Sequence, residues 1–166
     1  LLTVAPTRSC NFACPYCFEA NRAGIDMNRE TEEQLVRFAE RFQPGHIFSV
    51  TWFGGEPLLR FGQIRRLSER FRALDFRRYG ASLITNGYLL DADKAALLDE
   101  LAVREVQITL DGPEEVHDRR RTLVSGGGTF RRILENIDAL FTSGWTGRLL
   151  LRVNVDRTNA EEYHRI

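Results

Sequence analysis

The most constraining feature of this 166-residue sequence is its alternation of short apolar segments with longer segments of helical periodicity. Stretches rich in β-branched and aromatic residues are expected to be strands and lie at residues 2–5, 47–53, 82–85, 106–110 and 149–155. Between them, apolar side chains recur at helical spacing at residues 35–42, 64–74, 97–101 and 130–140, and another helix is expected to start at residues 160–166. The alternation predicts an α/β fold with a parallel sheet, either an open doubly wound sheet or a barrel.

The unusual motifs of the sequence each follow a predicted strand. A loop with three cysteines follows the first, and Gly54-Gly55-Glu56-Pro57 follows the second. Thr85-Asn86-Gly87 follows the third, and Asp111-Gly112-Pro113 the fourth. Because parallel strands place their chemistry at their carboxyl ends in both architectures, we expect these motifs to form one site.

Composition argues against two classes of partner. The 23 basic and 23 acidic residues give a formal net charge of zero, so bulk charge attracts neither nucleic acid nor an acidic membrane. No apolar run approaches the roughly 18 residues of a membrane span, and the first residues lack the layout of a signal peptide. The length suits one globular domain.

The three cysteines, Cys10, Cys14 and Cys17, fall within eight residues. An odd, clustered set is a poor disulfide framework and indicates a metal site. Three thiolates at C-x₃-C-x₂-C spacing can hold three corners of a four-iron cluster and leave one iron open to a substrate or cofactor. The alternative is structural zinc, which needs a fourth ligand and usually takes its ligands as two close pairs. That ligand would come from the distant histidines His46, His117 and His164.

The ordered set of motifs resembles the radical S-adenosylmethionine (SAM) enzymes. It is similar to their peptide- and protein-modifying branch, which includes anaerobic sulfatase-maturating enzymes and maturases that install thioether or carbon–carbon crosslinks. The matching segments, from about residue 2 to 155, are C-x₃-C-x-aromatic-C, Gly54-Gly55-Glu56-Pro57, Thr85-Asn86-Gly87, residues 110–113 with His117-Asp118, Gly128-Thr129-Phe130 and Arg152-Val153-Asn154.

The resemblance implies a fold and a domain boundary. The fold would be a partial (β/α)₆ TIM-like barrel, with about five strand–helix units in this chain. Residues 1–166 would be the core domain, with the last unit and any C-terminal SPASM or twitch domain lying beyond it.

The resemblance also implies a cofactor set. Cys10, Cys14 and Cys17 would hold a [4Fe–4S] cluster whose open iron binds the amine and carboxylate of SAM. Reductive cleavage of SAM would give a 5′-deoxyadenosyl radical that removes hydrogen from a peptide or protein side chain. An external reductant of the flavodoxin or ferredoxin type and a reducing, cytoplasmic location are expected.

Four residues match the segments that receive the methionyl ammonium and the adenine. Gly54 and Gly55 would let the backbone approach SAM, and Glu56 could accept a charge-assisted hydrogen bond from the ammonium. Tyr16 matches the aromatic residue before the last cysteine, where the backbone helps receive adenine.

Four further residues match other SAM contacts. Thr109 stands where the family often has serine, and together with Arg121 it is expected at the methionyl carboxylate. Asn86 is expected at the ribose, although Asn-Gly is also a common turn, and Asn154 is expected to face the same pocket.

Other roles stay open in the sequence. Arg119 and Arg120 adjoin Arg121, so the register of the carboxylate ligand is ambiguous. No general base is assigned to Asp111 or His117, and Trp52 and Trp145 are expected to pack. A radical enzyme with a small-molecule substrate is one alternative function. An electron-carrying iron–sulfur module is another, although such carriers normally fill every cluster corner with protein ligands.

Overall fold

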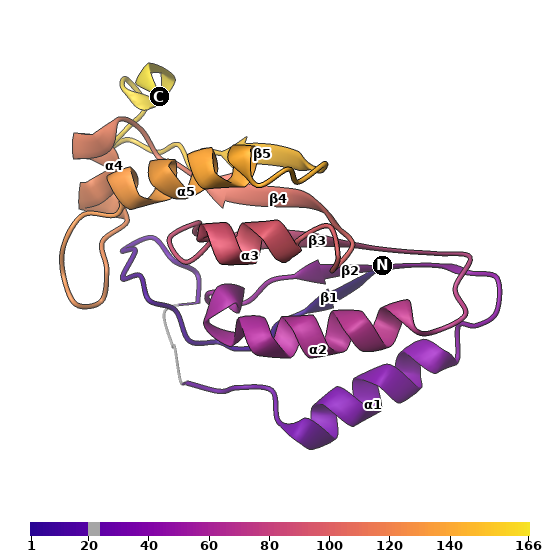
Figure 1. Cartoon of the computed structure of the whole chain (residues 1–166). Coiled ribbons are helices and arrows are strands. Elements are labelled where there is room, and N and C mark those ends of the chain that lie inside the picture. The colour runs from indigo at the N-terminus through magenta and orange to yellow at the C-terminus, as the bar shows by residue number, and fades with distance from the viewer. Residues whose placement is uncertain (20–23) are drawn as a thin grey trace.

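Five strands form one parallel sheet in the computed structural model, which describes residues 1–19 and 24–166. The strands are β1 (Leu2–Val4), β2 (Ile47–Trp52), β3 (Arg78–Thr85), β4 (Val103–Thr109) and β5 (Arg148–Arg152). Their order in the sheet is their order in the chain, so the sheet has no point at which the winding reverses (Figure 1). This arrangement is that of a barrel wall rather than a doubly wound sheet, which confirms the predicted partial barrel.

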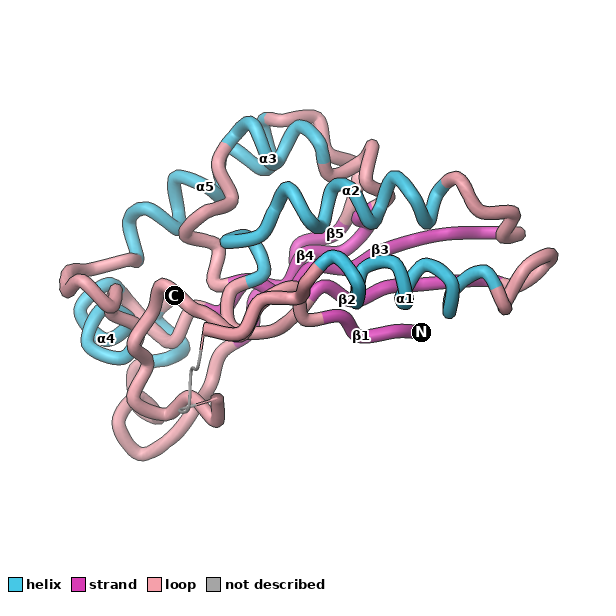
Figure 2. Tube along the Cα trace, turned by 90° about the horizontal axis from the view of Figure 1, so that it is seen from below, coloured by secondary structure: helices cyan, strands magenta, loops and turns pink. Residues whose placement is uncertain are grey.

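The helices between the strands cover one face of the sheet (Figure 2). They are α1 (Arg29–Glu40), α2 (Phe61–Arg72), α3 (Ala92–Leu97) and α5 (Phe130–Thr142), with a 3₁₀ turn η1 (Pro57–Arg60) before α2. Asn28 caps α1 by accepting from Thr31 N at 2.8 Å, and Asp91 caps α3 by accepting from Lys94 N at 3.0 Å. No helix in the described part of the chain is long and apolar enough to cross a bilayer.

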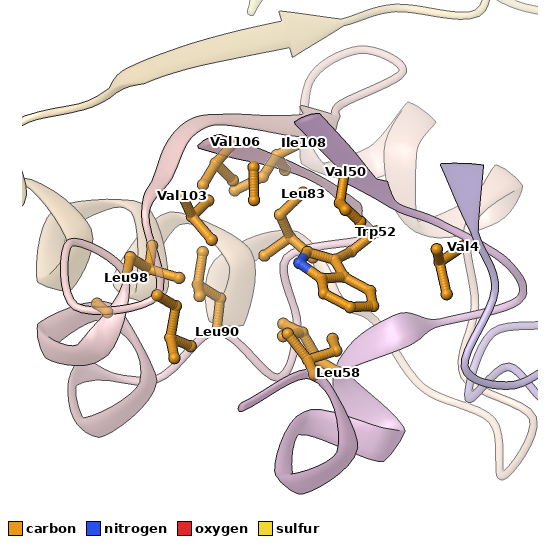
Figure 3. Packing of buried hydrophobic residues seen from close by; sticks show 14 of the residues in the cluster. Val4, Val50, Trp52, Leu58, Leu83, Leu90, Leu98, Val103, Val106 and Ile108 are labelled. Atoms are coloured by element: carbon orange, nitrogen blue, oxygen red, sulfur yellow. The ribbon is translucent and has the colours of Figure 1, made fainter. Parts of the chain in front are cut away.

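The two faces of the sheet differ in chemistry. Trp52, Leu83 and Ile108 are buried beneath the helices and form the centre of the apolar core (Figure 3). On the other face, Thr51 and Ser82 hydrogen-bond across β2 and β3 at 2.9 Å. The side chains that alternate with the core therefore form an inner wall of mixed polar and apolar residues, and a cavity opens where this wall reaches the carboxyl ends of the strands.

The carboxyl-terminal segment departs from the prediction. Residues 160–166 form turns and a single 3₁₀ element, η2 (Tyr163–Arg165), rather than the start of an α-helix. Asn159 explains the turns, because its Nδ2 donates to Asp111 O at 2.8 Å and Asn154 O at 2.9 Å. Strand β5 also ends earlier than predicted, at Arg152 instead of residue 155. Beyond Arg152, the backbone N–H of Asn154 donates to the side-chain Oδ1 of Asp111 at 3.0 Å instead of to a neighbouring strand.

Other departures lie within the sheet and its connections. Residues 114–120, for which no element was predicted, form helix α4 (Glu114–Arg120) at the carboxyl end of the sheet, and β3 begins at Arg78 rather than residue 82. Phe38 and Phe42 from the predicted stripe of α1 remain exposed and stack edge to face at 5.1 Å between centroids. Trp145 packs against the core as expected, with Nε1 donating to Val103 O at 2.7 Å.

Candidate functional site

A cavity of about 310 Å³ opens where the strands end, on the side of the sheet away from the helices. Loops after β1, β2, β3 and β4 and the end of β5 supply its walls, as the parallel arrangement requires. Ten of the eleven predicted site residues line it: Cys10, Cys14, Cys17, Tyr16, Gly54, Gly55, Asn86, Thr109, Arg121 and Asn154. Glu56 does not.

The cysteine loop is held by backbone pairing with a distant segment. Ala13 N donates to Thr122 O at 2.8 Å, and Val124 N donates to Asn11 O at 2.9 Å. These bonds fix the loop against the chain that follows α4. No disulfide forms among the described residues, so all three thiols remain available as ligands.

The sulfur of Cys10 already receives hydrogen bonds. Phe12 N–H donates to Cys10 Sγ at 3.4 Å, and Asn86 Nδ2 approaches the same sulfur at 4.0 Å. Donors of this kind stabilise a thiolate and tune the potential of an iron–sulfur cluster. The sulfur environment therefore fits a cluster ligand.

A single-ion site fits the structure less well. Within the described ranges, no three histidine, cysteine, aspartate or glutamate side chains come close enough together to hold one metal ion. None of the three histidines lines the cavity, and both ring nitrogens of His117 are engaged, at 3.3 Å from Asp111 N and 3.1 Å from Thr129 Oγ1. The zinc alternative thus finds no histidine ligand beside the cysteines among the described residues.

Gly54 and Gly55 bring the loop after β2 against the chain that enters the cysteine loop. Gly54 has a φ of +122°, and a Cβ on either glycine would overlap the carbonyl oxygens of Thr7 or Ser9. Gly55 N donates to Thr7 O at 3.1 Å, and Glu56 N donates to Ser9 O at 2.8 Å. The glycines therefore serve the join between two loops as well as lining the cavity.

Glu56 is fully buried beneath the cavity wall and faces protein donors. Its Oε1 accepts from Leu58 N at 3.0 Å and Thr85 Oγ1 at 2.7 Å, and its Oε2 accepts from Asn86 N at 2.7 Å. Burial raises the pKa of this carboxyl, while the three donors oppose that shift. The geometry gives Glu56 a positioning role, joining the start of η1 to the end of β3.

Arg121 presents an unsatisfied donor beside the cavity. Its Nη1 donates to the Tyr16 hydroxyl at 2.7 Å, and its guanidinium lies 5.6 Å from the centroid of the Phe12 ring. Its Nε is buried and has no hydrogen-bond partner among the residues the structure describes. Burial opposes its charge, but Tyr16 and Cys14 nearby raise its pKa above the ordinary value. Such an arginine fits a carboxylate ligand.

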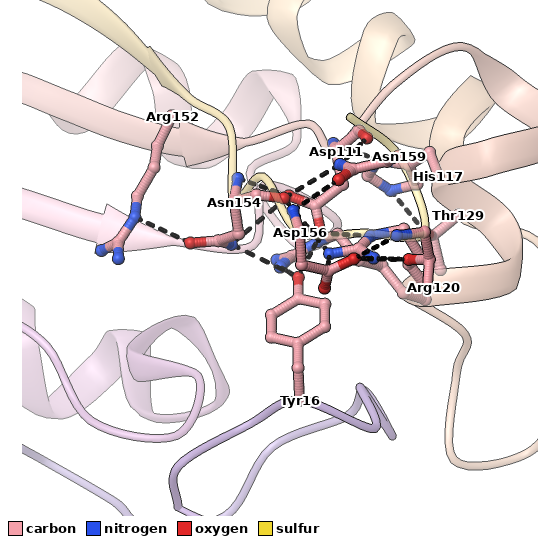
Figure 4. A network of polar contacts seen from close by, with 11 residues as sticks. Tyr16, Asp111, His117, Arg120, Thr129, Arg152, Asn154, Asp156 and Asn159 are labelled. Carbon is pink, nitrogen blue, oxygen red and sulfur yellow. Dashed lines mark hydrogen bonds and ion pairs between the residues drawn. The ribbon is translucent and has the colours of Figure 1, made fainter. Parts of the chain in front are cut away.

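A polar network fixes the cavity's outer wall around Asp111 (Figure 4). The fully buried Asp111 accepts from Tyr16 OH and from Arg120 Nε, the latter at 3.4 Å. Arg120 also makes a paired contact with Asp156, at 2.9 Å for each nitrogen. Desolvation raises the pKa of Tyr16 to about 12, so its hydroxyl stays protonated.

This network settles which arginine faces the cavity. Arg120 is occupied within the protein, Arg119 is exposed, and Arg121 lines the cavity. Asn154 joins the same network through Nδ2, at 3.3 Å from Asp111 Oδ1 and 3.4 Å from Tyr16 OH.

The His-Asp and Gly-Thr-Phe motifs hydrogen-bond to each other and support the backbone of Arg121. Thr129 Oγ1 donates to Arg121 O at 2.7 Å and accepts from His117 Nε2 at 3.1 Å. Asp118 Oδ1 accepts from Thr129 N at 2.7 Å and Phe130 N at 2.9 Å, which caps α5. Burial, reinforced by the charge of Arg121, lowers the pKa of His117 to about 4. His117 is therefore a neutral structural residue, and its ring is not exposed to the cavity.

Four polar residues of the cavity were absent from the predicted set, Glu19, Thr85, Gln107 and Arg152. Gln107 and Arg152 line it from the inner faces of β4 and β5. A signal was present in the sequence, because Gln107 lies two residues before Thr109, and Arg152 lies two residues before Asn154. In the predicted strands, 106–110 and 149–155, the period of two places each pair on one face.

The chain is similar to known proteins in both sequence and fold. The sequence model of the Radical SAM superfamily matches residues 4–166. A probable GTP 3′,8-cyclase from Methanocella arvoryzae is 31% identical over 167 residues, which cover 99% of this chain and 51% of that protein. A cysteine-type anaerobic sulfatase-maturating enzyme from Clostridium perfringens is 32% identical over 80% of this chain and 38% of its own length.

A solved structure, native anSMEcpe with bound AdoMet and Kp18Cys peptide, superposes with a TM-score of 0.84 at 26% identity. The match covers 99% of this chain and 46% of that one. The chain thus spans about half the length, or less, of these relatives.

Proposed function

Because the chain belongs to the radical SAM superfamily, we propose that residues 1–166 form a core domain holding a [4Fe–4S] cluster and SAM in one cavity. Cys10, Cys14 and Cys17 are the proposed cluster ligands. The observation that carries the proposal is that these thiols share a cavity with Arg121, whose buried Nε lacks a partner within the described structure. When bound, the cluster supplies the electron that cleaves SAM to a 5′-deoxyadenosyl radical.

The cavity residues divide into contacts and supports. Arg121 and Thr109 would receive the methionyl carboxylate, and the backbone of Gly54 and Gly55 would lie beside the ammonium. Glu56 is proposed to act through those residues rather than by touching SAM, since its oxygens are engaged with Leu58, Thr85 and Asn86.

The remaining predicted contacts belong to the nucleoside half of SAM. Asn86 lines the cavity while its Nδ2 donates to Asn11 Oδ1 at 2.8 Å, so its side chain is already oriented toward the cysteine loop. Tyr16 and Asn154 line the cavity with the network around Asp111 behind them. We propose that these three residues form the ribose and adenine side.

The proposed substrate is a peptide or protein side chain. Support comes from similarity to the sulfatase-maturating enzyme and to the structure with a bound peptide. We also propose a flavodoxin- or ferredoxin-type reductant and a reducing, cytoplasmic location, because thiolate ligands and their cluster require reduction. The net charge of zero supports the absence of a nucleic acid partner.

A small-molecule substrate is the second candidate. It is favoured by the 31% identity to the probable GTP 3′,8-cyclase, which covers 99% of this chain. The electron-carrier alternative is weaker, because the cysteine loop supplies only three ligands.

Deuterium transfer distinguishes these functions. The cluster-loaded protein, a chemical reductant and SAM are incubated with a pool of deuterated synthetic peptides or, separately, with GTP. We expect 5′-deoxyadenosine that carries deuterium from a peptide, and no product from a Cys17→Ser variant. Consumption of GTP without deuterium transfer from any peptide would favour the small-molecule function. A cluster that is reduced and reoxidised without cleaving SAM would favour an electron carrier.

A further inference from the structure

Several polar side chains of the cavity have no role in the proposed SAM site, and two of them lie on one wall. Gln107 and Arg152 line the cavity from neighbouring strands, β4 and β5. In the register of these strands Thr109 pairs with Arg152, and Gln107 pairs with Leu150. Arg152 therefore lies beside Thr109 near the strand ends, while Gln107 lies one layer deeper on the same wall.

Arg152 is oriented by one neighbour and otherwise open. Its Nε donates to Asn154 Oδ1 at 3.2 Å, and it forms no ion pair with any residue that the structure describes. Figure 4 shows its terminal nitrogens extending away from the Asp111 network. An exposed arginine held through Nε keeps the outer edge of its guanidinium for a planar anion.

Gln107 supplies a second donor on the same wall. Its Nε2 is buried and has no hydrogen-bond partner in the described part of the chain. A buried amide without a partner costs free energy, so a ligand that accepts from it gains affinity.

The cavity has two guanidinium groups, and SAM has one carboxylate. Arg121 and Arg152 both line the cavity, and the buried Arg121 is the one joined to Tyr16 beside the cysteine loop. If Arg121 takes the methionyl carboxylate, the charge of Arg152 remains for another anion. Glu19 also lines the cavity, but no ion pair joins it to Arg152 among the described residues.

We propose that Arg152 and Gln107 bind a carboxylate of the substrate, supplied by an acidic side chain of a peptide. This inference rests on the proposed function for the identity of the cavity's occupants. It adds that the substrate carries an acidic residue close to its reacting position, with the guanidinium as the main contact and the amide as the second.

A binding measurement with two matched probes tests the inference apart from turnover. The probes are fluorescein-labelled Ala-Ala-Asp-Ala-Ala amide and its counterpart with Asn in place of Asp, titrated against the cluster-loaded protein with SAM. The wild type should bind the acidic probe at least about tenfold more tightly, as expected for a charge-assisted pair. In Arg152→Gln that preference should fall below about threefold.

Arg148→Gln is the matched control. Arg148 lies on the same strand and face, four residues from Arg152, and its side chain pairs with Glu105 instead of lining the cavity. This variant should keep the wild-type preference. Equal binding of both probes by the wild type, no binding of either, or a preference that survives Arg152→Gln would overturn the proposal.

Gln107→Leu separates a binding role from a structural one. The variant removes an unpartnered buried amide, so its melting temperature should stay the same or rise while binding of the acidic probe weakens about threefold or more. A lower melting temperature with unchanged binding would contradict the assignment of Gln107. The proposed peptide chemistry is judged separately by deuterium transfer, so a carboxylate site can stand where that chemistry fails, and the reverse.

Discussion

Arg120 and Arg121 are adjacent in the chain and opposite in use. Arg120 donates hydrogen bonds to Asp111, Asp156 and Asn154. Arg121 lines the cavity, and its buried Nε has no partner among the described residues. The sequence alone could not separate them, because a run of three arginines carries no periodic signal. The separation comes from the end of α4, after which Arg121 turns inward.

Substitution of Arg121 should weaken SAM binding. Arg121→Lys keeps the charge but loses the planar fork, so the Kd for SAM should rise about tenfold or more in equilibrium binding to the cluster-loaded protein. Arg119→Lys, on the exposed side of the same run, is the control and should leave the Kd unchanged. An equal loss in both variants would remove Arg121 from the site.

The three hydrogen bonds of the buried Glu56 carboxylate predict a stability effect. Glu56→Gln places an amide N–H₂ against a backbone or hydroxyl donor, so one of three hydrogen bonds is lost in a buried position. We expect the free energy of unfolding in urea to fall by about 1–3 kcal/mol. Glu161→Gln, an exposed substitution, should change it by less than about 0.5 kcal/mol. Unchanged stability with lost SAM binding would instead make Glu56 a direct ligand.

The lowered pKa of His117 predicts that acid destabilises the fold. The pKa of this residue is lowered from 6.5 to about 4, so the unfolded chain takes up the proton first. Stability from this residue is full above pH 6.5 and is lost as the pH falls toward 4, by at most about 3 kcal/mol.

The melting temperature across this pH range measures that dependence. His117→Gln should show a shallower loss between pH 6.5 and 4 than the wild type. His46→Gln, on the exposed chain before β2, should reproduce the wild-type slope. A His117→Gln variant with an unchanged slope would show that other groups govern acid unfolding.

The loops after β1 and β2 meet at Gly54 and Gly55, where a side chain does not fit. The segment after β2 lies against the segment after β1, and the backbone bonds of Gly55 and Glu56 continue the pairing of those strands. The sequence predicted that Gly54 and Gly55 let the backbone come close to a ligand. It did not indicate that the same backbone also lies against the protein segment after β1. Only the position of Ser9 opposite Gly55 reveals it.

Gly55→Ala tests this join. The added Cβ would overlap the carbonyl oxygens of Arg8 and Ser9, both backbone atoms, so the two loops must separate. We expect a stability loss of about 2 kcal/mol or more and a lower iron content after reconstitution. Gly62→Ala, the same change on the exposed face of α2, should stabilise the protein by up to about 1 kcal/mol. Equal effects of the two substitutions would refute the role of the join.

At the scale of the whole molecule, periodicity predicted most of the architecture. Alternating segments gave five strands, and the position of each motif after a strand predicted one shared site. Helix α4 was not predicted, although Pro113 and Glu114 are typical of a helix start. The prediction that a helix starts at residues 160–166 was wrong. Asn159 donates hydrogen bonds to backbone groups of Asp111 and Asn154, and no local sequence pattern indicates these bonds.

For the site, the sequence predicted which residues gather but not the role of each one. Motif matching identified residues that line the cavity, and Glu56 shows its limit, since a buried supporting residue and a ligand have the same place in a motif. Gln107 belongs to no motif and is recognised only through its face on β4 and its unpartnered amide. Such residues depend on strand register, which one sequence does not determine.

The cavity beside the three cysteines is proposed to hold a [4Fe–4S] cluster together with SAM. The most direct measurement is anaerobic reconstitution with iron and sulfide, reduction, addition of SAM and chromatographic quantification of 5′-deoxyadenosine. We predict about four irons per chain and 5′-deoxyadenosine that disappears when Cys10, Cys14 or Cys17 is replaced by alanine. Tight zinc binding without cluster absorbance, or a complete cluster that leaves SAM intact, would contradict the account.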